Sequence, residues 1–84
     1  MTEEKTILLN RRKIVFQLRA ARIEKKMSQQ ALAEKVGTKR SNICRIELGH
    51  QNISLDLLLK IAAALGTTVL VTFCDERNNS TEES

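Results

Sequence analysis

One stretch decides the fold: AEKVGTKRSNICRIELGH, residues 33–50. Gly37 suits the left-handed backbone that ends many helices, and Thr38 behind it is an N-cap candidate for the next helix. Ile43 and Ile46 lie three residues apart on one face of that next helix, so the polar residues around them point elsewhere. The stretch predicts a tight turn between two short helices, the second of which buries one side and exposes a polar, basic side.

Helical spacing also covers most of the chain around this stretch. Residues 10–26 form an expected amphipathic first helix, and residues 6–9 either extend it or form a separate arm. Ser28 is the N-cap candidate of the short second helix, and Ser54 caps a fourth helix that Gly66 closes. The positions expected to face the core are Ile14, Leu18 and Ala21 in the first helix, Ala31, Leu32 and Val36 in the second, and Leu55, Leu58, Ile61, Ala62 and Leu65 in the fourth.

Residues 67–74, TTVLVTFC, have the alternation and the β-branched content of a strand. A single strand leaves its backbone groups unpaired, and no second strand is evident, so the economical partner is the same strand of a second copy. The alternative is a strand that folds back on its own domain. Residues 75–84 have the composition of a disordered, acidic tail. The residues expected in the dimer strand are Val69, Leu70, Val71 and Phe73.

Composition agrees with a small helical domain. The chain has 84 residues, three glycines and no proline, tryptophan or tyrosine, which favours helices joined by short turns. A chain this short buries only about 60% of the surface that its unfolded form exposes, so one domain with a small core is expected. Charge is uneven: residues 11–50 carry eleven Lys/Arg against three Glu, a net of +8, whereas residues 75–84 sum to −3. Such a basic block attracts polyanions.

Several function classes find no support in the sequence. Cys44 and Cys74 lie far apart without a CxxC pair, and His50 is the single histidine, so neither a metal site nor a cofactor is expected. No set of side chains for nucleophilic catalysis is present, and the small core leaves no room for a small-molecule site. No signal peptide or membrane span is evident. A non-enzymatic, cytoplasmic protein is the expectation.

Residues 28–66 resemble the helix-turn-helix of the phage-repressor family, also called the Cro/C1 or XRE family. The matching features are Gln29, Ala33, Gly37, Ile43, Ile46, Glu47, Gly49 and the pattern LxxIAxALG at residues 58–66. The resemblance implies an all-α, lambda-repressor-like domain of four to five helices over residues 10–66. Residues 1–9 then form an arm or a helix extension, residues 67–74 the dimerising strand, and residues 75–84 the tail.

The same resemblance assigns roles to individual residues. The exposed start of the helix at residues 38–48 enters the major groove of double-stranded DNA, where arginine reads guanine bidentately. Arg22 and Glu47 form a structural ion pair or, alternatively, are two unconnected surface charges. Cys44 either touches a thymine methyl or fills space. The base-contacting candidates are Arg40, Ser41, Cys44 and Arg45, and the phosphate-contacting candidates are Gln29, Gln30, Lys39, Asn42, His50 and Asn52.

A single recognition helix makes few base contacts, so these proteins usually dimerise and read two half-sites. The expected function is a homodimeric repressor of its own operon that reads an inverted repeat. One alternative is an antitoxin, because a repressor domain followed by one strand and a short tail resembles the HipB-like antitoxins, which also bind a protein toxin. The other is a protein-interaction module that has lost DNA binding, against which the basic block argues.

Overall fold

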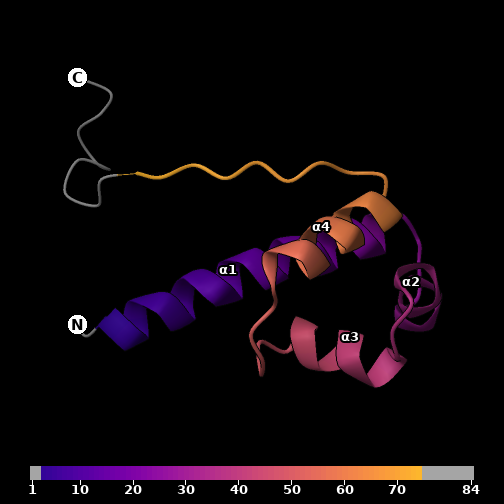
Figure 1. Ribbon diagram of the computed structural model, residues 1–84, viewed down its shortest axis with the longest axis horizontal. Coiled ribbons are helices and arrows are strands. Elements are labelled where there is room, and N and C mark those ends of the chain that lie inside the picture. The colour runs from indigo at the N-terminus through magenta and orange to yellow at the C-terminus, as the bar shows by residue number, and fades with distance from the viewer. Residues whose placement is uncertain (1–2, 75–84) are drawn as a thin grey trace.

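The computed structural model describes residues 3–74 and contains four helices in that range. These are α1 (Glu3–Glu24), α2 (Gln29–Val36), α3 (Arg40–Glu47) and α4 (Leu55–Ala64). In Figure 1 the long α1 crosses the view, α4 overlaps its carboxyl-terminal half, α2 lies at the right-hand end and α3 lies below. Contacts join α2 to α3 and to α4, and α1 to α3. The prediction of an all-α, helix-turn-helix fold is confirmed.

The first helix is longer at its start than the expected range. It begins at Glu3, so residues 3–9 continue it as helix, and it ends at Glu24. Lys26 stops it with a left-handed backbone (φ 56°). Its buried stripe runs through Val15, Leu18 and Arg22, at intervals of three and four residues. Ile14 lies beside that stripe and is 46% exposed, so its expected core position is wrong.

Local chemistry fixes both ends of α2 and the start of α4. The Ser28 hydroxyl accepts a hydrogen bond from the amide of Ala31 at 3.0 Å, and Ser54 does the same for the amide of Leu57 at 3.0 Å. Gly37 ends α2 in the left-handed conformation (φ 88°), which costs glycine little because it has no Cβ. These three predicted helix boundaries are confirmed.

The predicted cap of α3 is wrong. Lys39 occupies the N-cap position, without a side-chain cap hydrogen bond, and the helix begins at Arg40. Thr38 still belongs to the preceding turn, since its amide donates to the Ala33 carbonyl at 2.9 Å. Its hydroxyl instead accepts a hydrogen bond from the side-chain amide (Nδ2) of Asn42 at 3.0 Å.

The core lies where the four helices meet. Ala33 is fully buried, and its small side chain lets α2 and α3 approach closely. Leu55 is 62% exposed, so its expected place in the core is wrong: it is the first residue of α4 and lies outside the packed part of that helix. The buried apolar residues are Val15, Leu18, Leu32, Ala33, Ile43, Ile46, Ile61, Ala62 and Leu65.

Residues 67–74 follow α4 as extended chain, to which no strand is assigned within the described range. Pairing of this segment with a second copy stays a prediction. The predicted acidic tail at residues 75–84 lies outside the described residues. None of the helices between residues 3 and 74 combines the length and the apolar character that crossing a membrane requires.

Replacing Ile46 with alanine tests the core directly. Because Ile46 is fully buried, Ile46→Ala should lower the free energy of unfolding by about 2–5 kcal/mol, measured by urea denaturation at one protein concentration. Ile23 on α1 is 50% exposed, so the matched control Ile23→Ala should change it by about 0.5 kcal/mol or less. Equal losses in the two variants would contradict this description of the core.

Candidate nucleic-acid interface

A buried ion pair fixes α3 against the end of α1. The Arg22 guanidinium donates through Nε to Glu47 Oε2 at 2.6 Å and through Nη2 to Glu47 Oε1 at 3.0 Å. Its Nη1 donates to the carbonyl of Met27 at 2.8 Å, which uses the remaining side of the fork. The Glu47 side chain is only 3% exposed. This bidentate geometry sets the orientation of α3 as well as its distance from α1.

The ion pair continues through Gln29 to the first residue of α3. Gln29 Nε2 donates to Glu47 Oε1 at 3.1 Å, and Gln29 Oε1 accepts from Nη1 of Arg40 at 3.3 Å. The expected contact of Gln29 with phosphate stays a prediction. In this structure its side chain links the buried carboxylate to the exposed Arg40, so it orients a candidate base-reading group.

A second chain of hydrogen bonds holds the other arginine of α3. Arg45 Nε donates to Gln51 Oε1 at 3.2 Å, and Gln51 Nε2 donates to Asn42 Oδ1 at 2.7 Å. Asn42 closes the chain by donating to Thr38 Oγ1 at 3.0 Å. Both ends of the Asn42 side-chain amide are thus engaged within the protein, and its expected contact with phosphate stays a prediction.

Gln51 is a site residue that the sequence did not single out. It lies in the loop after α3, and only the fold brings its amide between Arg45 and Asn42. Its polar character in a loop is too common to serve as a signal. The structure therefore adds a positioning residue to the candidate interface.

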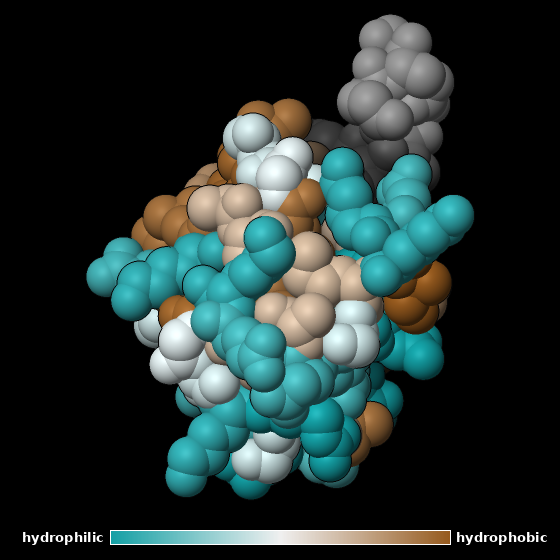
Figure 2. All heavy atoms as spheres, turned by 90° about the vertical axis from the view of Figure 1, so that its right-hand side faces the viewer, coloured by the Kyte–Doolittle hydropathy of each residue, from teal (hydrophilic) through white to brown (hydrophobic). Residues whose placement is uncertain are grey.

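The remaining candidates form the rim and surface of α3. Gln30 donates to Glu34 on its own helix at 2.9 Å, and Cys44 is half-buried with a free thiol. Figure 2 shows the molecule from the side on which α2 lies, and hydrophilic side chains cover most of its lower part. The helix α3 lies at this height in Figure 1. The exposed candidates are Lys39, Arg40, Ser41, Arg45, His50 and Asn52.

This surface suits recognition of a polyanion with base edges. Two exposed arginines on one short helix offer guanidinium forks, which match the O6 and N7 acceptors of guanine. Residues 3–74 contain no group of His, Cys, Asp or Glu side chains able to hold a metal ion. The hydrogen-bonded arginines are thus the chemically distinctive feature of this side of the protein.

The ion pair makes a stability prediction. Glu47→Ala leaves the Arg22 guanidinium buried without its carboxylate, so the free energy of unfolding should fall by about 3–5 kcal/mol in thermal or urea denaturation. Glu34 is exposed and bonds only Gln30, so the control Glu34→Ala should change it by about 0.5 kcal/mol or less. A Glu47→Ala variant as stable as the control would show that the pair does not hold α3 in place.

Comparison with known proteins agrees with this geometry. A family model described as helix-turn-helix matches residues 18–71, which include the end of α1 and all of α2, α3 and α4. No curated protein and no solved structure matches the chain. The match covers more than half of the sequence and contains both the turn at Gly37 and the helix that carries the two arginines. The chain therefore belongs to the helix-turn-helix family, as a DNA-binding transcription regulator of the Cro/C1 type.

Proposed function

We propose that the protein is a dimeric repressor of its own operon that reads an inverted-repeat operator through α3. The observation that carries the proposal is the state of the two arginines. Arg40 and Arg45 are exposed, yet each is held by a glutamine of the protein, Gln29 or Gln51. Side chains held in place before binding make sequence-specific contacts at a smaller entropic cost.

Each exposed polar residue of α3 has a role in this proposal. Arg40, Ser41 and Arg45 contact base edges, with Cys44 beside them facing a thymine methyl. Lys39 at the start of the helix contacts phosphate. The contacts proposed to lie along the sugar-phosphate backbone around α3 also include Gln29, Gln30, Asn42, His50 and Asn52.

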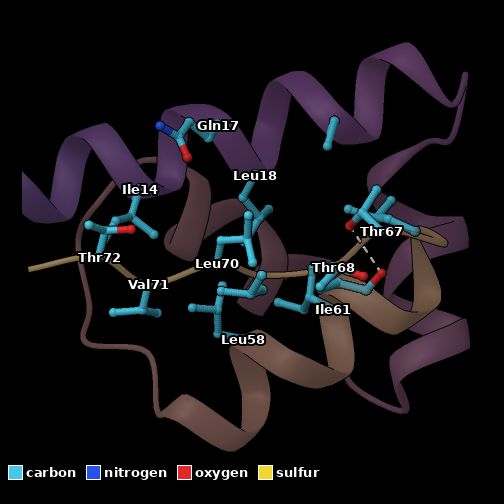
Figure 3. Close-up of a pocket in the computed structure, with 14 residues that line it drawn as sticks. Ile14, Gln17, Leu18, Leu58, Ile61, Thr67, Thr68, Leu70, Val71 and Thr72 are labelled. Carbon is cyan, nitrogen blue, oxygen red and sulfur yellow. Dashed lines mark hydrogen bonds between the residues drawn. The ribbon is translucent and has the colours of Figure 1, made fainter.

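The carboxyl-terminal segment supports dimerisation. Residues 67–72 border an apolar groove of about 540 Å³, toward which Ile14 and Gln17 extend from α1 and Leu58 and Ile61 from α4 (Figure 3). Val71, which borders the groove, is 67% exposed, and Phe73 beyond it is 95% exposed. An extended segment with exposed apolar side chains and unpaired backbone groups is a template for a second strand. In a dimer that reads an inverted repeat, the two copies of α3 contact half-sites about 34 Å apart, which is one helical turn of DNA.

An antitoxin role adds a protein toxin to these partners. The resemblance to HipB-like antitoxins motivates it, and no contact of the described residues favours it over a stand-alone repressor. Co-expression with the neighbouring gene, followed by purification of this chain, separates the two. A stoichiometric complex would extend the proposal to an antitoxin, and its absence would leave the repressor.

Fluorescence anisotropy tests the function as a whole. The DNA upstream of the protein's own gene and a scrambled duplex of equal length are titrated across a salt series. Nanomolar binding to the upstream DNA, several orders tighter than to the scrambled duplex, is expected of an autoregulating repressor. Equal, weak and steeply salt-dependent binding to both would reject sequence-specific repression.

Substitution of Arg40 tests base reading. Arg40→Ala should weaken binding to the operator by about 1–3 kcal/mol and leave binding to the scrambled duplex almost unchanged, because the lost contact is with a base. Lys60, an exposed residue of α4, provides the charge-matched control Lys60→Ala, which should keep the preference for the operator. Equal loss on both duplexes would reassign Arg40 to phosphate.

Substitution of Val71 tests the dimer. Val71→Asp should shift the protein from dimer to monomer in light scattering at low micromolar concentration, because it puts a charge into the strand pair. Ile23 is 50% exposed, lies at the carboxyl-terminal end of α1 and does not border the groove, so Ile23→Asp should keep the mass of the wild-type protein. An unchanged mass for Val71→Asp would reject pairing through this segment.

A further inference from the structure

We propose that a groove between α1 and the end of α3 is a second DNA-backbone site, with phosphate held by Arg12 and Arg19 and deoxyribose packed against Phe16 and Leu48. This inference rests on the proposed function and extends its footprint beyond the helix-turn-helix. The groove has a volume of about 430 Å³. Arg12, Phe16 and Arg19 border it from α1, and Cys44, Glu47 and Leu48 from the α3 side.

The groove is contiguous with the recognition surface. Gln29 forms part of its wall and also holds Arg40 through the 3.3 Å hydrogen bond. Cys44 borders the groove and follows Arg40 by four residues, so the two lie on one side of α3. A duplex that contacts Arg40 therefore brings its backbone to the mouth of the groove.

The charge of the groove fits a phosphate. Arg12 forms no ion pair with any residue of the described range, and the Arg19 side chain is 56% exposed. The carboxylate that borders the groove, Glu47, is 3% exposed and already receives two hydrogen bonds from Arg22 and one from Gln29. Arg19 Nε lies 3.9 Å from that carboxylate, so the Arg19 guanidinium is at the groove. Because the carboxylate is already bonded to Arg22, the positive charge of Arg19 is not neutralised. The two arginines thus face solvent as a cationic rim.

The apolar part of the groove fits the sugar between two phosphates. Phe16 is 68% exposed and Leu48 is 57% exposed, so both side chains remain available to a ligand. The stem of Arg12 lies over Gly49 at the end of α3, with its Cγ 3.7 Å from the position that a Cβ of Gly49 would take. That packing holds the Arg12 stem at the edge of the groove. Guanidinium groups beside exposed apolar side chains match the alternation of phosphate and deoxyribose along a strand.

The test measures salt dependence on the full-length protein with both the upstream duplex and the scrambled duplex. Arg12→Ala should lower the slope of log affinity against log salt by about 0.9, the value for one phosphate contact, and should do so equally on the two duplexes. Arg19→Ala should give a second decrease of this size. Phe16→Ala should weaken binding with the slope unchanged, because an apolar contact releases no counterion.

Three controls make the outcome decisive. Lys60→Ala removes one positive charge from α4, away from α3, and should keep the wild-type slope. Ile7→Ala removes a 58% exposed apolar side chain near the amino-terminal end of α1, outside the groove, and should keep the wild-type affinity. Thermal unfolding checks that Arg19→Ala, whose side chain lies near Glu47, remains folded. If it does not, Arg12→Ala carries the test, because Arg12 is outside the buried ion pair.

Slopes for Arg12→Ala and Arg19→Ala that match Lys60→Ala would overturn the site. That result leaves the proposed function intact if the wild-type protein still prefers the upstream duplex. Conversely, a wild-type protein without that preference rejects the repressor, while the slopes on the scrambled duplex still decide whether the groove binds the DNA backbone.

Discussion

The buried pair of Arg22 and Glu47 is the constraint on which the rest of the structure depends. It joins the end of the first helix to the end of the third, across 25 residues of sequence, and it leaves neither group free for solvent. Its desolvation makes the pair costly to break and strict in geometry. The same carboxylate receives Gln29, so the position of Arg40 at the surface follows from a charge pair in the interior.

Two hydrogen-bond paths thus connect the scaffold to the surface of α3. One runs from Glu47 through Gln29 to Arg40, and the other from Thr38 through Asn42 and Gln51 to Arg45. Each path ends on an arginine that faces outward. The helix is only eight residues long, and its two buried isoleucines pack into the core on the side opposite to these arginines.

The sequence predicted those features that neighbouring residues determine. Ser28, Gly37 and Ser54 act within one helical turn, and their boundaries are where local chemistry placed them. The core predictions for Ile14 and Leu55 were wrong because periodicity defines the buried face of a helix only approximately, and packing decides which residues are buried. The cap prediction for Thr38 was wrong because packing also decides at which residue a helix begins. Gln51 escaped prediction altogether, since its partners are nearby only after the loop has folded. The ion pair came from the family resemblance, because no local rule relates Arg22 to Glu47.

The tether from Gln51 to Arg45 has a consequence for how this surface changes in evolution or design. An arginine side chain has about 2 kcal/mol of rotamer freedom to lose, and a neighbour that already restricts it reduces that loss on binding. A new residue at position 45 would lie beside Gln51, whose side chain is oriented to accept a hydrogen bond from a guanidinium. Asn42 in turn holds Gln51 in that orientation. In the proposed role of Arg45 as a base-reading residue, altered sequence preference requires coordinated changes at positions 42, 45 and 51, so retargeting involves the hydrogen-bonded trio and not the single side chain.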